Sequence, residues 1–189
     1  MTVSDRRGDV TIDTDEQPGN ARPEKIPALR PAFAKDGTIT AANSSSISDG
    51  AAALMLTTRA NAEQLGLTVL ATIKGHTTHA QEPSLFTTAP VGAMAKLLSN
   101  VGWSKDEVDL FEINEAFAMV TMLAVSELGL DMAKVNVNGG ACALGHPIGC
   151  SGARLLVTLI HALKARGLKR GVASLCIGGG EATAMAIEV

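Results

Sequence analysis

The sequence predicts an α/β fold with a mixed, largely parallel sheet, and two observations lead to that prediction. Strand-like and helix-like apolar segments alternate from about Val69 to the C-terminus. The chain of 189 residues is 46% hydrophobic but only 3% aromatic, so small aliphatic side chains must fill its core. Such a core suits closely packed layers of sheet and helix.

The expected elements follow from apolar periodicity and from capping residues. Ser104-Lys105-Asp106-Glu107 has the form of a capping box, so a short helix is expected to start there. Short apolar runs predict strands, and longer runs with helical spacing predict helices. In chain order we expect strand 69–74, helix 90–101, the short helix at 104, strand 110–113, helix 116–128, strand 135–138, helix 151–165, strand 172–176 and strand 182–189.

The part of the chain before Val69 has a different character. Residues 1–35 are polar, contain proline and show little periodicity, which predicts an extended loop. Residues 51–58 form a short apolar run that predicts a buried strand. Residues 59–65 predict a short helix that ends at Gly66.

The stretch from Gly139 to Arg154 carries the strongest functional signal. It places His146 among five glycines, directly before a helix-like apolar segment. Glycines let the backbone approach a ligand closely and leave amides free at the start of a helix. A histidine held there can move a proton near neutral pH or donate a hydrogen bond to a developing oxyanion. The alternative is a tight turn with an incidental histidine.

Polar residues also follow two of the expected strands. Asn114 and Glu115 follow the run 108–113, while Cys176 follows the run 171–175 and precedes three glycines. The carboxyl ends of strands are where α/β folds place chemistry. The amide can fix a water or a carbonyl, and the thiol can act as a nucleophile or as an acid/base. The alternatives are an N-cap asparagine and a small buried cysteine.

Taken in order, these motifs closely resemble the C-terminal half of the thiolase family pattern, and the resemblance covers essentially the whole chain. Its acetyl-CoA acetyltransferase branch, also called acetoacetyl-CoA thiolase, is the most similar. The resemblance implies the C-terminal half of the thiolase fold, a layered α/β structure with a mixed five-stranded sheet. The matching segments are 36–53, Asn114-Glu115-Ala116-Phe117-Ala118, the Gly-His-Pro-Ile-Gly-x-Ser-Gly-x-Arg run around His146, and Cys176-Ile177-Gly178-Gly179-Gly180.

The resemblance also implies how the chain is divided. Residues 1–47 would be the tail of the loop domain that contacts coenzyme A (CoA). Residues 48–68 would be the last strand and helix of the N-terminal thiolase domain, and residues 69–189 the C-terminal domain. The family's nucleophilic cysteine lies in the N-terminal half, in a Cys-x-Ser context that none of the three cysteines here has. We therefore expect the isolated chain to be inactive and to need an N-terminal thiolase half as its partner.

The resemblance implies a role for each matched residue. Cys176 would be the acid/base that removes a proton from the acetyl-CoA methyl group, with a thiol pKa lowered by cationic or dipolar surroundings. His146 would activate the nucleophilic cysteine and, with a water held by Asn114, bind the thioester oxygen. The Gly178 N–H would serve a second oxyanion hole. Ser45 would contact the pantetheine of CoA, and Ala116 and Phe117 would line the acyl pocket. Glu115 would orient Asn114 or the water on Asn114. Alternatively, Glu115 would be a carboxylate in the first turn of a helix.

The implied activity is acyl transfer. The complete protein would condense two acetyl-CoA to acetoacetyl-CoA and CoA, or cleave acetoacetyl-CoA by thiolysis, through an acyl-cysteine. One alternative is a 3-ketoacyl-CoA thiolase of longer-chain fatty acid degradation. An alternative of another class is a non-catalytic CoA-binding fragment or pseudo-enzyme. No cofactor is expected beyond the CoA thioester substrate.

Composition and charge exclude several other classes. A net charge of −3 without a basic stripe argues against nucleic acid, and the apolar runs are shorter than the ~20 residues of a membrane helix. His76 and His79 have no third ligand nearby in sequence, so no metal site is expected. Three cysteines without framework spacing predict reduced thiols and a cytoplasmic location. Thiolases are usually dimers or tetramers, so a homo-oligomer is expected.

Overall fold

The computed structural model describes residues 1–189, which divide into two compact units, Met1–Arg30 and Pro31–Val189. Every residue of the first unit is exposed to solvent. Its local structure is more regular than the extended loop predicted for residues 1–35, because β1 and β2 pair as a hairpin and the Asp15 carboxylate caps a short helix. Its elements are β1 (Thr2–Asp5), β2 (Gly8–Thr11), α1 (Glu16–Asn20) and a 3₁₀ turn (Pro23–Ala28).

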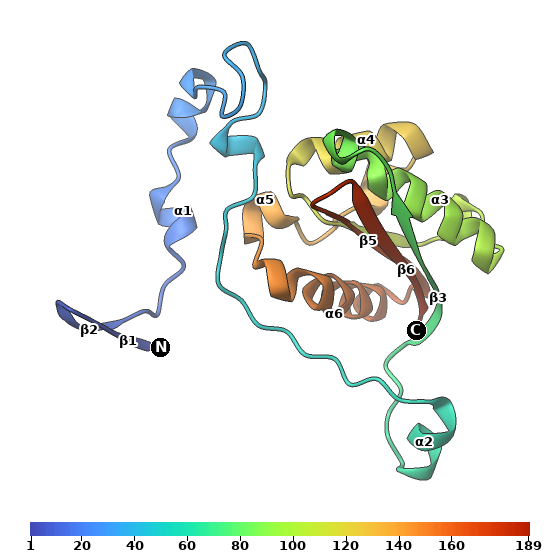
Figure 1. The fold of residues 1–189 in the computed structure, drawn as a ribbon. Helices are drawn as coiled ribbons and strands as arrows, with labels where there is room; N and C mark the ends of the chain where they lie inside the picture. The colour runs from blue at the N-terminus through green and yellow to red at the C-terminus, as the bar shows by residue number, and fades with distance from the viewer. The chain divides into compact units, whose positions relative to one another are not determined.

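The second unit is built on a four-stranded mixed sheet (Figure 1). Its strands, in spatial order, are β3 (Thr72–Ala80), β6 (Glu181–Glu188), β5 (Arg170–Ile177) and β4 (Leu110–Ile113). The first three pair antiparallel, and only β4 and β5 are parallel. The prediction of a largely parallel sheet is therefore wrong, although the α/β class and the mixed sheet are confirmed.

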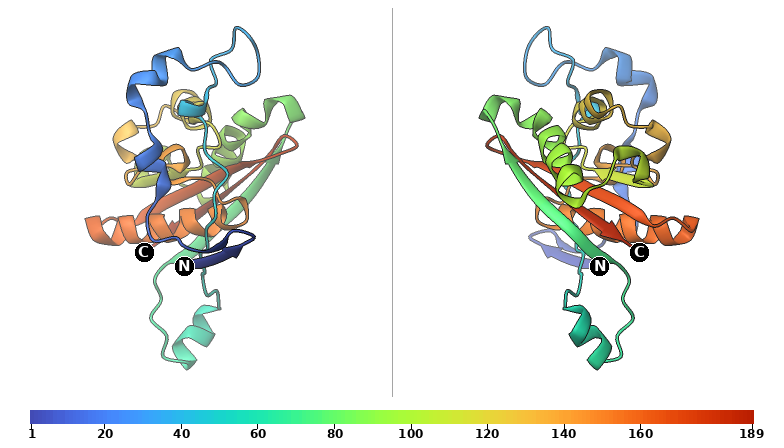
Figure 2. Two further views of the ribbon diagram at one scale, coloured as in Figure 1. Left: turned by 90° about the vertical axis from the view of Figure 1, so that its left-hand side faces the viewer. Right: turned by 90° about the vertical axis from the view of Figure 1, so that its right-hand side faces the viewer.

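Helices cover both faces of this sheet. Helix α3 packs on β3 and β6, while α6 packs on β4 and β5 from the opposite side (Figures 1 and 2). The helices of the unit are α2 (Arg59–Gln64), α3 (Ala89–Val101), α4 (Ala118–Leu128), α5 (Ala141–Leu144) and α6 (Ile148–Arg166). Short 3₁₀ turns lie at Ala41–Asn43, Pro83–Thr88, Lys105–Glu107 and Met132–Lys134.

Alternation along the strands divides the interior into two hydrophobic cores. On β4, Phe111 and Ile113 join the core beneath α3, whereas Leu110 joins the core beneath α6. Small side chains at alternate positions of β6 let α3 lie close to the sheet. Leu159 of α6 fills the second core and lies so near β5 that a Cβ at Gly171 would approach it to 2.8 Å.

The predicted fifth strand is absent. Residues 135–138 form only one bridge to β4, between Val135 and Phe111. Asn136 has a left-handed backbone with φ of 46°, and its side chain bonds to the N–H and C=O of Ile113. Because the Gly139 N–H then donates to the Asn136 carbonyl, the chain turns away from the sheet instead of extending along it.

The remaining predictions for this unit have mixed outcomes. Strand 110–113 has the predicted bounds, and the capping box at Ser104 is present. Residues 51–58 form no strand and are largely exposed, because no neighbouring strand pairs with them. The first strand of the sheet begins at Thr72 and runs to Ala80, later and longer than predicted. The remaining predicted helices and the last two strands are present, within three residues at each end.

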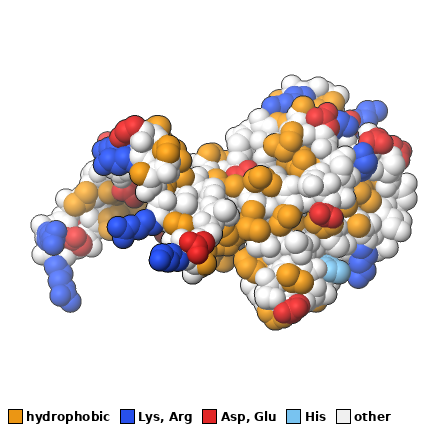
Figure 3. All heavy atoms as spheres, turned by 90° about the horizontal axis from the view of Figure 1, so that it is seen from above, with side chains coloured by type: hydrophobic (Ala, Val, Ile, Leu, Met, Phe, Trp, Pro, Cys, Tyr) orange, Lys and Arg blue, Asp and Glu red, His pale blue; other side chains and the backbone are white.

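Helix α6 is long and apolar enough by length and composition to cross a membrane. In the structure, its buried leucines instead pack against the sheet. Elsewhere, hydrophobic side chains are spread over the surface seen in Figure 3. Ile47, Met55 and Leu56 are the clearest cases in the extended segment before α2, at 90%, 86% and 68% exposed. Apolar surface of this kind is expected where another polypeptide binds.

Candidate active site

The carboxyl ends of β4 and β5 bring two of the predicted catalytic residues to one edge of the sheet. Ile113 pairs with Ser174 in the parallel ladder, and the Asn114 N–H donates to the Ser174 carbonyl at 2.9 Å. Cys176 lies two residues farther along β5. Asn114 and Cys176 therefore occupy adjacent strand ends, where α/β folds place their chemistry.

The glycine-rich loop carries His146 to this edge. Gly145 is buried with φ of 86°, and a Cβ there would lie 2.3 Å from the Ser48 hydroxyl oxygen. Only glycine adopts this conformation at so close an approach. The His146 N–H then donates to the Ser46 carbonyl at 2.9 Å, and His146 forms a bridge with Ile47. The backbone of His146 is thus fixed by the segment of residues 46–48.

Both ring nitrogens of His146 have partners. Nε2 lies 3.3 Å from Nδ2 of Asn114, and Nδ1 lies 2.5 Å from the hydroxyl oxygen of Ser151. The ring is half-buried, and this burial, with the nearby Arg154 guanidinium, lowers the pKa of His146. The imidazole is therefore neutral near pH 7 and can accept a proton there.

Asn114 is fully buried, and its Oδ1 has no hydrogen-bond partner. A buried amide oxygen without a partner is costly unless a ligand or a water meets it. The polar atoms at this edge therefore include one acceptor with free capacity beside the His146 ring. This feature agrees with a water held by Asn114, the role implied by the sequence resemblance.

The contacts of Glu115 differ from those expected for it. Its carboxylate accepts hydrogen bonds from Nδ2 of Asn136 at 3.0 Å and from the Cys142 N–H at 3.1 Å, not from Asn114. It is not a first-turn carboxylate either, because α4 begins at Ala118. A Cβ at Gly140 would come within 2.1–2.3 Å of the carboxylate atoms. Glu115 thus anchors the glycine-rich loop.

The surroundings of Cys176 differ from the expectation. The side chain is buried, and burial raises the pKa of the thiol, where we expected cationic or dipolar surroundings to lower it. At neutral pH the group is a protonated thiol, suited to donate a proton. Burial has the same effect on Cys142, whose pKa rises to about 11.

Gly178 lies in the exposed turn between β5 and β6. The next two glycines have left-handed φ angles of 100° and 90°. A Cβ at Gly180 would lie 2.3 Å from the Gln81 carbonyl oxygen, so the turn packs directly on the backbone after β3. A Cβ at Gly178 would meet nothing within 4 Å, which leaves that side of Gly178 open to a ligand.

The predicted substrate-contacting residues lie together. The Ser45 N–H and hydroxyl both donate to the Ala116 carbonyl, at 3.2 and 3.0 Å. Phe117 packs edge-on against Phe33 and Phe86, with ring centroids 5.7 and 6.3 Å apart. The structure therefore places Ser45, Ala116 and Phe117 side by side next to Asn114.

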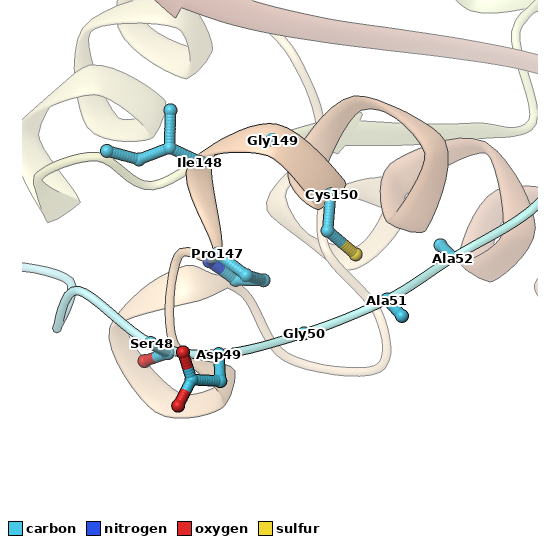
Figure 4. Close-up of a pocket in the computed structure, with 9 residues that line it drawn as sticks. All are labelled: Ser48, Asp49, Gly50, Ala51, Ala52, Pro147, Ile148, Gly149 and Cys150. Atoms are coloured by element: carbon cyan, nitrogen blue, oxygen red, sulfur yellow. The ribbon is translucent and has the colours of Figure 1, made fainter.

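An open hollow of about 310 Å³ lies between residues 48–52 and residues 147–150, at the start of α6. Figure 4 shows the Cys150 sulfur pointing toward residues 50 and 51 of the extended segment. The Asp49 carboxylate points away from Cys150. A Cβ at Gly50 would lie 2.6 Å from Pro147. Residues 48–52 therefore pack closely on the residues that follow His146, and the hollow lies open between these two segments.

Sequence reasoning missed three residues that shape the site. Ser151 contacts the His146 ring, and Asn136 connects β4 to Glu115. Arg154 lies 3.5 Å from Glu112, a fully buried carboxyl whose pKa burial raises to about 7, although the Arg154 charge opposes that shift. The signal for Ser151 and Arg154 was their place in the glycine-rich motif, five and eight residues after His146.

No group of three or more His, Cys, Asp or Glu side chains is arranged to hold a metal ion. His76 and His79 lie on β3, where Nε2 of His79 contacts the Gln81 side chain at 3.2 Å. His161 is exposed on α6. The candidate site itself presents the His146 imidazole, the Asn114 amide, the Cys176 thiol and backbone N–H groups.

Comparison with known proteins gives consistent results along the whole chain. Residues 67–189 match the family described as "Thiolase, C-terminal domain", and residues 1–60 match "Thiolase, N-terminal domain". The acetyl-CoA acetyltransferase of Chromobacterium violaceum is 51% identical, over all of this chain and 48% of that protein. The chain spans about half the length of the curated relatives that it matches.

Solved structures agree with this result. The Bacillus anthracis acetyl-CoA acetyltransferase has a TM-score of 0.91 at 47% identity, over 99% of this chain and 48% of that one. The human mitochondrial 3-ketoacyl-CoA thiolase in complex with CoA has a TM-score of 0.84 at 38% identity, over 99% and 47%.

Proposed function

Because the chain belongs to the thiolase family, we propose that it supplies His146, Asn114 and Cys176 to acyl transfer between CoA thioesters. The favoured reaction is that of an acetyl-CoA C-acetyltransferase, which joins two acetyl-CoA to acetoacetyl-CoA and CoA or runs the reverse thiolysis. The observation that carries the proposal is the contact between His146 and Asn114, at the strand end next to that of Cys176.

In the direction of condensation, His146 would first take the thiol proton of a nucleophilic cysteine, which attacks acetyl-CoA and becomes an acyl-cysteine as CoA leaves. The Cys176 thiol would give its proton to the departing CoA, and the Cys176 thiolate that remains would then take a methyl proton from a second acetyl-CoA. The resulting carbanion attacks the acyl carbon, and the nucleophilic cysteine leaves and recovers its proton from His146 as acetoacetyl-CoA forms. In the reverse reaction, the protonated Cys176 thiol donates its proton to the departing acetyl-CoA enolate.

Oxyanion stabilisation would come from two places. The His146 ring and a water on Asn114 would bind one thioester oxygen, and the Gly178 N–H would bind another. A donor placed at an oxyanion lowers the activation barrier by about 2.7–4 kcal/mol. The unpartnered Asn114 Oδ1 supports the first of these sites. The exposure of Gly178 in the turn after β5 supports the second.

The reaction needs a second cysteine, which we assign to an N-terminal thiolase half. None of Cys142, Cys150 and Cys176 has the Cys-x-Ser context of that nucleophile. The half could belong to the same longer protein or to a separate chain, and we propose that residues 1–189 alone have no turnover. We further propose a homo-oligomer for the complete enzyme and a cytoplasmic location.

Reconstitution tests this function. Residues 1–189 would be mixed with the N-terminal half of the Chromobacterium violaceum acetyl-CoA acetyltransferase, and thiolysis of acetoacetyl-CoA would be followed with CoA present. We expect activity from the mixture and none from either half. Cys176→Ala should lower the rate by at least about 10²-fold, the typical share of a positioned acid/base. Cys142→Ala is the matched control and should keep the rate.

The outcomes distinguish the candidate functions. Equal loss in both cysteine variants would contradict the role of Cys176. Turnover that rises with acyl chain length would favour a longer-chain 3-ketoacyl-CoA thiolase, a reading supported by the 38% identity to the human enzyme. CoA binding by a mixture that shows no turnover would instead favour a non-catalytic CoA-binding fragment.

A further inference from the structure

Ser151 contacts the His146 ring but has no part in the reaction proposed above. It is fully buried in the first turn of α6, and its hydroxyl oxygen lies 2.5 Å from Nδ1 of His146. The same oxygen lies 3.0 Å from the Pro147 carbonyl, four residues earlier. Serine in a helix commonly donates back to the carbonyl at this spacing.

These two contacts decide which atom donates. A carbonyl oxygen can only accept, so the single hydroxyl proton of Ser151 points to Pro147. The contact between Ser151 and His146 then requires a proton on Nδ1 of the ring. The tautomer of a neutral histidine is set by the hydrogen bond that its other nitrogen makes, which leaves Nε2 as the unprotonated acceptor.

The other side of the ring agrees with this assignment. Nε2 faces the Nδ2 amide of Asn114 at 3.3 Å, and an amide nitrogen can only donate. The chain of donors therefore runs in one direction, from Asn114 to Nε2 and from Nδ1 through Ser151 to the Pro147 carbonyl. The lone pair of Nε2 accepts this hydrogen bond from Asn114, at the strand end next to that of Cys176.

We propose that Ser151 is a positioning residue that holds His146 in the Nδ1–H tautomer, with Nε2 as the atom that receives the proton. Its importance for catalysis rests on the proposed function, in which His146 takes the proton of a thiol. When Nε2 gains that proton it gives up the hydrogen bond from Asn114, while Nδ1–H already donates to Ser151, so no hydroxyl has to turn. The opposite arrangement, with Ser151 donating to Nδ1, would protonate Nε2 beforehand and block this step.

The tautomer can be measured directly in the 189-residue chain. Long-range ¹H–¹⁵N correlation spectra of ¹⁵N-histidine-labelled protein would be recorded at about pH 8, where the imidazole is neutral. His146→Gln identifies the His146 signals among the four histidines by their loss. We expect the wild-type spectrum to show the proton on Nδ1, and Ser151→Ala to shift the population toward the Nε2–H form.

Thr158→Ala is the matched control, because Thr158 lies two turns farther along α6 and should leave the His146 signals unchanged. A wild-type His146 that carries its proton on Nε2 would overturn the proposal, and so would Ser151→Ala with the Nδ1–H form retained. The wild-type result suffices if Ser151→Ala does not fold. Since the spectra require no turnover, failure of the reconstituted reaction and failure of this assignment can be distinguished.

Discussion

Residues 1–70 and residues 72–189 differ in how much side-chain surface they bury. Ala62 is the single buried residue of the first region, whereas the second contains both hydrophobic cores. The candidate catalytic residues all lie in the second region. Hydrophobic burial is the main favourable contribution to folding, so the scaffold of the site should be stable without residues 1–70.

The two regions nevertheless meet at the site. Residues 45 and 46 bond through their backbone to the Ala116 carbonyl and to the His146 N–H. A few backbone hydrogen bonds contribute about 0.5–1.5 kcal/mol each, far less than the cores. The position of the loop around His146 and the stability of the fold are therefore determined by different parts of the chain.

The largest expected effect comes from the core beneath α6. Leu159 is fully buried there, so Leu159→Ala should lower the free energy of unfolding by about 2–5 kcal/mol, through lost contacts and a cavity. Met55→Ala, in the exposed segment, should change it by less than about 0.5 kcal/mol. Urea unfolding followed by circular dichroism measures both. Similar losses in the two variants would contradict the division between the regions.

The buried carboxyl of Glu112 gives the next effect, which depends on pH. Burial raises its pKa from 4.5 to about 7, a difference worth on the order of 3 kcal/mol. Between these values the folded state keeps a proton that the unfolded state has lost. The free energy of unfolding should therefore fall as pH rises from about 4.5 to 7, and become level above pH 7.

Urea unfolding at a series of pH values tests this expectation. Glu112→Gln should remove that fall, since an amide does not titrate in this range. Glu107→Gln is a control, because the Glu107 carboxyl should change the free energy of unfolding with pH in the opposite direction. The Ser104 N–H and the Arg170 guanidinium lower the pKa of Glu107, so its carboxylate contributes stability above pH 4.5 that falls away in acid. An unchanged pH profile in Glu112→Gln would contradict the assignment.

The success of the sequence-based predictions also differs between the two regions. Elements whose apolar pattern reflects burial in the two cores, such as strand 110–113 and the long helix before β5, could be read from the sequence. Residues 51–58 have an apolar pattern without burial, so the pattern was misleading there. Residues 135–138 were misjudged because the side chain of Asn136 replaces the backbone pairing of a strand.

The sequence motifs could suggest candidate residues for the site but not the contacts of those residues. The motifs identified His146, Asn114 and Cys176. The pKa direction of Cys176 and the contacts of Glu115 depend on residues far apart in sequence, and periodicity carries no information about them. Ser151 was within the motif, yet its role depends on the turn that places it beside the His146 ring.

The smallest expected effect is at the loop where the two regions meet, and a pair of glycines isolates it. Gly145→Ala would place a Cβ 2.3 Å from the Ser48 hydroxyl oxygen at φ of 86°, which should cost about 1–3 kcal/mol. Gly149→Ala, four residues later in the first turn of α6, meets nothing within 4 Å. It should be neutral or stabilise the chain by up to about 1 kcal/mol, because alanine favours a helix.

Urea unfolding and the His146 signals in the ¹H–¹⁵N spectra would be compared for these two variants. We expect Gly145→Ala to shift the His146 signals, because the loop must move away from residues 46–48, and Gly149→Ala to leave them in place. If the two variants are equally stable and the His146 signals are unchanged in both, residues 46–48 do not hold the loop around His146 in place. The position of His146 would then be determined by the core region alone, and the distinction between the two regions would fail at the site.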